Sequence, residues 1–174
     1  GLTSLREAMA QSMNVIAVKT LNDVSPKIGY DYLLNLGFTT LVDNYTSQDG
    51  KTYTDISLPL ALGGLTKGVT NLELTNGFAT IANQGLYHPA FFYTKIVDHD
   101  GNVLLDNTIN TDTRQVMKES TAWLLTSAME DVILKGTGSR LKFKKINMPQ
   151  AGKTGTSTGM EFWIMVDNFL YYKL

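Results

Sequence analysis

The chain has 174 residues, of which 43% are hydrophobic and 18% are charged, and this is enough apolar material for a globular protein with a buried core. Its 15 basic and 16 acidic residues leave a formal charge of -1, so the net charge indicates no charge-driven attraction to nucleic acid or to anionic lipid. The absence of cysteine excludes thiol catalysis, disulfides and cysteine-ligated zinc.

Two histidines, His88 and His99, stand in unrelated contexts, one before a proline and one in a predicted turn. Their placement disfavours a histidine-ligated metal site and a Ser-His-Asp hydrolase. No apolar run approaches the roughly 20 residues that span a bilayer, and no basic and then apolar leader opens the chain. We expect the chain to be part of a longer protein, so this says nothing of where that protein resides.

The N-terminal part is predicted to be helical. Thr3 or Ser4 can cap a first helix over residues 6–10, and the turn-forming residues 12–14 separate it from a second helix over residues 15–21. A third helix begins with Ser25-Pro26 as cap and first-turn proline, and Gly37 ends it. Its predicted apolar side consists of Tyr30, Leu33, Leu34 and Leu36.

The middle of the chain is more irregular. Residues 43–57 are polar and predict an exposed loop with a short strand, and the glycines in residues 58–69 indicate a tightly packed crossing. Thr70 or Asn71 caps a further helix that ends near Gly85. A hairpin is predicted around residues 98–102, because Asp-Gly strongly favours chain reversal between two apolar runs.

The C-terminal part combines one long helix with two strands. The helix is predicted from about Lys118 to Lys135, and it stops at Gly136-Thr137-Gly138. Strands follow over residues 152–157 and 162–166, joined at Thr158-Gly159. This order of elements predicts an α+β fold with helices packed on an antiparallel sheet. On the long helix we expect burial of Trp123, Leu124, Met129, Val132 and Ile133.

The first of these strands carries Lys153-Thr154-Gly155-Thr156. Alternation along a strand places the lysine and the glycine on one face and the two threonines on the other. A lysine there can orient a carboxylate and favour loss of a proton from a nearby hydroxyl, and a glycine lets a peptide approach the strand. A plain surface strand with an exposed lysine fits the same four residues, and the run alone does not decide between the two.

Gly152-Lys153-Thr154 is also the last part of a P-loop, the phosphate-binding sequence of many nucleotide hydrolases. That motif requires a glycine five residues before Gly152, where this chain has Asn147. It also requires a helix to follow, and residues 154–159 are a poor helix start. The sequence therefore disfavours phosphate binding at this run.

Ser12-Met13-Asn14 is the second chemical signal. A hydroxyl and a carboxamide two residues apart can point into one cleft, where the serine relays a proton and the asparagine binds a substrate amide. The simpler interpretation is that Ser12 or Asn14 caps the following helix, which is a common role for both residue types.

Together, Ser-x-Asn at residues 12–14 and Lys-Thr-Gly at residues 153–155 resemble two of the three motifs of penicillin-binding proteins and serine β-lactamases. The flanking residues are similar to those of class A (bifunctional) penicillin-binding proteins of Gram-positive, clostridia-like type. These flanks are residues 4–14, residues 61–70 with the helix that follows, and residues 135–138. The resemblance extends over nearly the whole chain.

The resemblance implies the penicillin-binding protein and serine β-lactamase-like fold, with residues 1–174 as a partial transpeptidase domain that is incomplete at both ends. It implies a peptidoglycan D,D-transpeptidase at the extracytoplasmic face of the bacterial membrane. The implied partners are peptidoglycan stem peptides, β-lactams and the remainder of the parent domain. The resemblance implies no metal, no organic cofactor and no nucleic-acid partner.

The resemblance also implies roles for individual residues. Ser12 and Lys153 would be catalytic, because they would assist proton transfer and hold the charge of the substrate carboxylate. The strand at residues 153–156 would pair with the peptide backbone, and the two threonine hydroxyls are candidates for the carboxylate. The implied substrate-binding residues are Asn14, which would bind the donor peptide's amide, and Thr154, Gly155 and Thr156.

The family's nucleophile is the serine of a Ser-x-x-Lys motif that lies upstream of Ser-x-Asn. The eleven residues before Ser12 contain no such motif, and the sole match in the chain is Ser139 to Lys142, between the other two motifs. That place is wrong for the family, so we interpret this match as solvated loop. We therefore expect the chain to lack the nucleophile and to be inactive by itself.

Two other interpretations stay open at the level of the sequence. One is a degenerate, non-catalytic module that binds wall peptides or a partner protein. The other is an unrelated α+β interaction domain in which both motifs are accidental. The latter predicts that the side chains of Ser12 and Lys153 lie more than about 10 Å apart, beyond the reach of shared proton transfer.

Overall fold

The structure is a computed structural model that describes residues 1–109, 112–143, 148–157 and 160–166, with the backbone alone from residue 156 onward. At its centre, β7 (Ala151–Ser157) and β8 (Met160–Val166) form an antiparallel pair. The predicted strand pair is thus confirmed, and its predicted connection at residues 158–159 lies outside the described residues.

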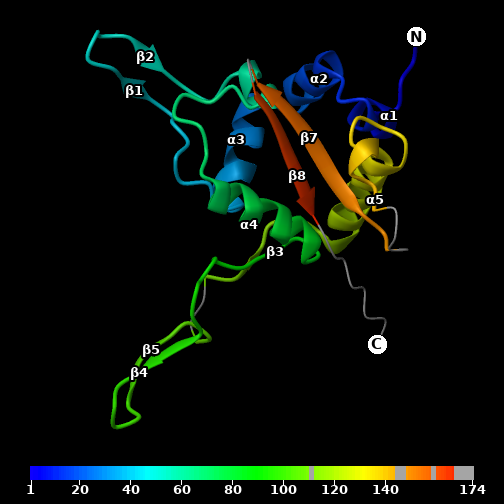
Figure 1. The fold of residues 1–174 in the computed structure, drawn as a ribbon. Helices are drawn as coiled ribbons and strands as arrows, with labels where there is room; N and C mark the ends of the chain where they lie inside the picture. The colour runs from blue at the N-terminus through cyan, green and yellow to red at the C-terminus, as the bar shows by residue number, and fades with distance from the viewer. Residues whose placement is uncertain (110–111, 144–147, 158–159, 167–174) are drawn as a thin grey trace.

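Helices cover this strand pair. α5 (Glu119–Leu134) packs along β7, and α4 (Asn71–Ala82) contacts β8 (Figure 1). α5 also packs against the N-terminal α1 (Leu5–Ala10), which brings together two segments that lie far apart in the sequence. The predicted α+β class, with helices packed on antiparallel strands, is confirmed.

Three helices open the chain as the sequence predicts: α1, α2 (Asn14–Val24) and α3 (Pro26–Asn35). Ser4 caps α1, because its hydroxyl oxygen accepts a hydrogen bond from the amide of Glu7 at 3.1 Å. Pro26 is the first residue of α3, where its missing N–H has no helical partner to lose.

The predicted apolar side of α3 is only partly right. Tyr30 is buried, whereas Leu34, one turn later, is 43% exposed. α3 packs against α2 and a short 3-10 helix, η1 (Leu58–Leu62). In the part of the chain that the structure describes, neither neighbour covers Leu34, so spacing alone overestimates the buried stripe.

The polar segment after α3 contains the two short strands β1 (Tyr45–Thr46) and β2 (Thr52–Tyr53), in agreement with the predicted loop and short strand. This segment is predicted to be exposed, but its residue Asp55 is only 1% exposed. Burial by itself would raise the pKa of Asp55, but hydrogen bonds from Thr66 and from the Val42 amide outweigh burial and lower the pKa. The buried carboxylate therefore fastens two loops together.

α4 begins with the predicted cap. The Thr70 hydroxyl accepts from the Glu73 amide at 3.1 Å, and the Glu73 carboxylate accepts from the Thr70 amide at 2.9 Å. This reciprocal capping box satisfies two amides that the helix itself leaves unpaired. Before it, Gly63 and Gly68 adopt left-handed backbone angles, in keeping with the irregular crossing that the sequence predicts.

The predicted hairpin is confirmed as β4 (Lys95–Val97) and β5 (Val103–Asp106), which project away from the remaining elements (Figure 1). A further strand pair, β3 (Leu86–Tyr87) with β6 (Arg114–Gln115), joins the base of this projection. Each of these strands has two residues, too few for a recognisable alternation.

α5 ends before Gly136 as predicted, but the predicted burial of two of its residues is wrong. Trp123 and Leu124 are 54% and 57% exposed. At 100° per residue, Leu124 lies on the side of the helix opposite the buried stripe. None of the described helices is long and apolar enough to cross a bilayer. The buried residues of α5 are Ala122, Thr126, Met129, Val132 and Ile133.

Candidate active site

The turn between α1 and α2 holds Ser12 in the left-handed backbone region, with φ of 53°. The Ser12 amide donates to the Met9 carbonyl at 3.1 Å, and the Met13 amide donates to the Ala8 carbonyl at 2.9 Å. This is the hydrogen-bond pattern of a Schellman helix end, in which the left-handed position is usually a glycine. A serine at that position adds backbone strain of about 1 kcal/mol, and in return places a hydroxyl at the turn.

Helix capping does not explain the Ser-x-Asn sequence. The cap residue of α2 is Met13, and its side chain makes no capping hydrogen bond. Asn14 is instead the first residue of α2 and is exposed. The capping interpretation of Ser12 and Asn14 is therefore wrong, and both polar side chains are left for other contacts.

Lys153 on β7 reaches the Ser12 turn. Its ammonium donates to the Ser12 hydroxyl oxygen at 2.7 Å and to the Thr154 carbonyl at 2.8 Å. Two residues 141 positions apart in the sequence thus meet at hydrogen-bonding distance. This contact excludes the interpretation as an unrelated domain, which predicts that these side chains lie far apart.

The environment of Lys153 favours an incoming anion. The side chain is half-buried, and this burial lowers the pKa of Lys153 below its ordinary value of 10.5. Within the described part of the chain no carboxylate pairs with it, and only two of its three N–H donors are used. A partly desolvated cation with a free donor is suited to binding a substrate carboxylate.

The rest of the strand presents its groups differently. The Thr154 hydroxyl lies 2.6 Å from that of Thr137, whereas Lys153 points toward Ser12. Gly155 is exposed and paired with Phe162 in the strand register. Thr156 continues β7, and its side chain lies outside the described part.

Asn14 is the predicted site residue that the structure does not join to the others. In the described residues, its carboxamide makes no hydrogen bond with Ser12, Lys153 or Thr154. Its position at the start of α2, next to the Ser12 turn, leaves the carboxamide free to bind an amide of another molecule.

The turn after α5 packs against the end of α1, directly before the Ser12 turn. The amide of Thr137 donates to the Ala10 carbonyl at 3.0 Å. Gly136 lies so close to α1 that an added Cβ would stand 2.1 Å from the same carbonyl oxygen. Sequence reasoning identified this Gly-Thr-Gly sequence as a helix end and missed its contacts with both halves of the site.

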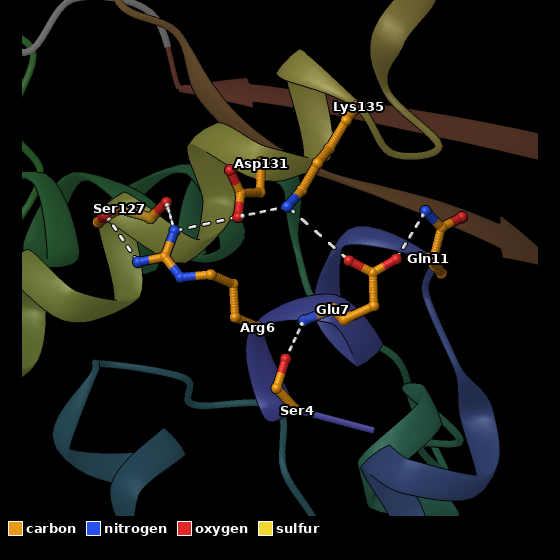
Figure 2. A network of polar contacts seen from close by, with 7 residues as sticks. All are labelled: Ser4, Arg6, Glu7, Gln11, Ser127, Asp131 and Lys135. Atoms are coloured by element: carbon orange, nitrogen blue, oxygen red, sulfur yellow. Dashed lines mark hydrogen bonds and ion pairs between the residues drawn. The ribbon is translucent and has the colours of Figure 1, made fainter. Parts of the chain in front are cut away.

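Side chains of α1 and α5 form a second link between these helices (Figure 2). Arg6 donates to the Ser127 carbonyl at 2.8 Å and to Asp131 at 3.1 Å. Lys135 bridges Asp131 at 3.3 Å and Glu7 at 3.8 Å. Exposed pairs of this kind contribute about 0.2–1 kcal/mol each, but as a network they fix the direction in which α1 enters the Ser12 turn.

The hydrogen bond from Arg6 is the main cause that holds the pKa of Asp131 below its usual range. Burial opposes it, and Lys135 adds a smaller effect in the same direction as Arg6. Asp131 therefore stays ionised at neutral pH and keeps both cations in place. The network is strongest above the ordinary titration range of an aspartate and is lost as the pH falls through the lowered pKa.

The single Ser-x-x-Lys sequence has no described hydrogen bond with Ser12 or Lys153. Ser139 begins the short 3-10 helix η2 (Ser139–Leu141), and Ser139 and Lys142 are both exposed. Among the described residues no hydrogen bond joins the Ser139 hydroxyl to Lys142. The solvent-exposed position agrees with the sequence interpretation, although the local structure is a helical turn.

Comparison with known proteins identifies the family. The sequence matches the family described as penicillin binding protein transpeptidase domain over residues 1–161. The chain belongs to this family. It is 32% identical over 158 residues to penicillin-binding protein 1F of Bacillus subtilis, covering 91% of this chain and 20% of that protein. It is 31% identical over 159 residues to penicillin-binding protein 1A of Clostridium novyi, covering 91% of this chain and 17% of that protein.

These penicillin-binding protein relatives agree with the Gram-positive, clostridia-like character of the sequence, and the chain spans about a fifth of their length. Among solved structures, PonA1 of Mycobacterium tuberculosis in complex with penicillin V matches with a TM-score of 0.71 at 25% identity, over 90% of this chain and 41% of that one. Penicillin-binding protein 1A of Haemophilus influenzae matches with a TM-score of 0.67 at 20% identity, over 89% of this chain and 26% of that one. The transpeptidase fold of the family is thereby confirmed.

Proposed function

We propose that this chain supplies two walls of the cleft of a peptidoglycan D,D-transpeptidase: the Ser12 turn and the Lys153 strand. The observation that carries the proposal is the 2.7 Å hydrogen bond between Lys153 and Ser12. It joins the two family motifs at a half-buried cation, next to a strand that can pair with a peptide. Membership of the family supports acyl transfer as the chemistry of this arrangement.

In the proposed reaction, a serine outside residues 1–174 attacks the amide carbonyl between two D-alanines of a stem peptide. An ester C–O bond forms, the amide C–N bond breaks, and the serine's proton ends on the amine of the released D-alanine. An amine of a second stem peptide then attacks the ester, forms the cross-link and returns the proton to the serine. A β-lactam would acylate the same serine through its strained amide.

Ser12 and Lys153 serve this reaction as a proton relay. Because the Ser12 oxygen accepts a hydrogen bond from the Lys153 ammonium, the Ser12 proton is free to move to the leaving nitrogen. The ammonium can then return a proton to Ser12. Its third N–H donor and its positive charge hold the terminal carboxylate of the stem peptide.

The remaining residues bind the substrate. Asn14 binds the amide of the donor peptide, and the edge of β7 from Lys153 to Thr156 pairs with its backbone. Gly155 allows the peptide to approach closely, and the hydroxyls of Thr154 and Thr156 donate to the carboxylate. Stem peptides and β-lactams are the proposed ligands, and neither a metal nor an organic cofactor takes part.

The proposal treats residues 1–174 as part of a larger transpeptidase domain that acts at the extracytoplasmic face of the bacterial membrane. Its nucleophile belongs to a Ser-x-x-Lys motif in the remainder of that domain. Support comes from the exposed position of Ser139, which is unsuited to the role, and from the share of the relatives' length that this chain covers.

Labelling with a fluorescent penicillin tests the proposal. The full-length protein that contains this chain should be labelled stoichiometrically, and Lys153→Ala should reduce the labelling rate by at least about 100-fold. Purified residues 1–174 should remain unlabelled. Ser139→Ala in the full-length protein is the control and should be labelled at the wild-type rate.

Stoichiometric labelling of residues 1–174 alone would show that the nucleophile lies within this chain. A full-length protein that binds wall peptides without being acylated would support a degenerate binding module instead.

A further inference from the structure

Thr137 joins the two walls of the proposed cleft through two separate contacts. Its hydroxyl lies 2.6 Å from the hydroxyl of Thr154 on the Lys153 strand. Its amide donates to the carbonyl of Ala10, two residues before Ser12, at 3.0 Å. The hydrogen bond from the Gly138 amide to the Val132 carbonyl at 3.0 Å fixes the same turn to α5. The position of the Thr137 hydroxyl is therefore set by the scaffold on both sides.

Either hydroxyl of this pair can be the donor, and the choice decides whether Thr154 keeps a proton for a ligand. A hydroxyl has one proton to donate and two lone pairs with which it accepts. If Thr154 donates to Thr137, it has no proton left for a ligand. If Thr137 donates to Thr154, the Thr154 proton is free. The Lys153 ammonium contacts the Thr154 carbonyl at 2.8 Å, so an anion held by Lys153 lies beside Thr154. Such an anion favours the second arrangement because it attracts the Thr154 proton.

We propose that Thr137 is a positioning residue for carboxylate recognition: it donates to Thr154 and so directs the Thr154 proton to the carboxylate of a stem peptide or β-lactam. The inference rests on the proposed transpeptidase function and extends it to a residue that touches no substrate. A chain of two hydrogen bonds ending on a carboxylate strengthens each bond through mutual polarisation.

The hydrogen bond between Thr137 and Thr154 contributes little to the stability of the fold. Thr137 is exposed, and water can replace its partner without leaving a buried group unsatisfied. Loss of the Thr137 hydroxyl should therefore leave the fold intact and change the recognition of a carboxylate.

The test compares acylation of the full-length protein by a penicillin and by the methyl ester of the same penicillin, which lacks the carboxylate charge. Thr137→Val keeps the shape and removes the donor. It should lower the second-order rate of acylation by the penicillin about tenfold and leave the rate with the ester nearly unchanged, as expected for one hydrogen bond that supports a charged ligand. Thr137→Ser should restore the penicillin rate.

A double-mutant cycle makes the test sharper. If Thr137 acts through Thr154, the double variant Thr137→Val, Thr154→Val should lose no more than Thr154→Val alone. Ser139→Ala is the matched control for loss of an exposed hydroxyl nearby, and it should leave both rates at the wild-type level.

The outcomes separate the two proposals. A labelled wild-type protein in which Thr137→Val changes the penicillin and ester rates equally, or in which the two substitutions are additive, overturns the role of Thr137 and leaves the transpeptidase function standing. A full-length wild-type protein that neither compound acylates overturns both.

Discussion

The carbonyl oxygen of Ala10 accepts a hydrogen bond from the amide of Thr137 at 3.0 Å, and this bond attaches the end of α1 to the turn after α5. Ser12 follows two residues after Ala10. The place of the Ser12 hydroxyl therefore depends on a turn from the other end of the sequence, where Gly136 has room for no side chain. The proposed proton relay therefore depends on this packing contact.

Gly136→Ala should damage the protein more than Gly138→Ala. A Cβ at residue 136 would stand 2.1 Å from the backbone oxygen of Ala10, whereas one at residue 138 would first meet the Ile133 side chain at 2.9 Å, which can rotate away. We expect Gly136→Ala to lower the free energy of unfolding by about 1–3 kcal/mol and to slow penicillin acylation. Urea unfolding and labelling kinetics of the full-length variants measure both; equal effects of the two substitutions would contradict the packing argument.

Ser12→Gly and Ser12→Ala should differ in stability but not in activity. Both remove the hydroxyl, so acylation should fall by about 10²–10⁴-fold in each. The left-handed backbone at residue 12 suits glycine, and alanine keeps the strain that serine has. The glycine variant should thus be about 1 kcal/mol more stable than the alanine variant in urea unfolding. An alanine variant of equal or greater stability would show that the turn is not strained.

Lys153 should make activity and stability change in opposite directions at alkaline pH. Burial lowers the pKa of Lys153 below 10.5, so the folded protein loses this proton before the unfolded chain does. The free energy of unfolding should rise between the folded pKa and 10.5, because the unfolded state binds more protons there. Acylation should fall over the same range as the ammonium is lost.

Lys153→Met is the control for the stability measurement and should abolish this rise. Unfolding measured from pH 8 to 11 and acylation rates over the same range provide the comparison; a rate that increases as Lys153 loses its proton would contradict the role of the charged ammonium.

Glu73 should make the fold sensitive to acid. Burial raises the pKa of Glu73, but donors from Thr39 and Thr70 outweigh burial and lower it from 4.5 to about 2. The stabilisation is present above pH 4.5 and is lost as the pH falls toward about 2. Glu73→Gln should cost about 1 kcal/mol at neutral pH and flatten the decline of stability over this range.

Glu119→Gln is the matched control for this prediction, because Glu119 lies in the first turn of α5 and accepts no hydrogen bond from the described residues. Thermal unfolding from pH 2 to 7 compares the two variants. An equal loss of acid sensitivity in both would refute a special role for the capping box.

Local signals predicted most helix limits correctly. Ser4, Pro26 and Thr70 start helices at the expected places, because a cap or a fixed backbone angle acts on residues close in sequence. The contact between Ser12 and Lys153 was predicted from a family resemblance, since the hydrogen-bonding abilities of two side chains give no distance between them.

Burial was harder to predict. Trp123 and Leu124 are apolar but exposed, and Asp55 is charged but buried, because burial depends on which elements lie across from a residue. For a similar reason the contacts of Thr137 were not predicted, although residues 135–138 are part of the family resemblance. Its contacts with Ala10 and Thr154 exist only after three distant segments have packed, and a threonine between two glycines carries no sign of them.

The hairpin of β4 and β5 contacts no other helix or strand among the described residues, and its turn at Gly101 has open space around it. Such a unit can open without disturbing the strand pair that carries Lys153, so its amides should exchange with solvent independently of the core. The same isolation makes residues 98–102 a suitable place to insert a fluorophore or an affinity tag. A reporter attached there would follow the protein without contact with the strand that carries Lys153.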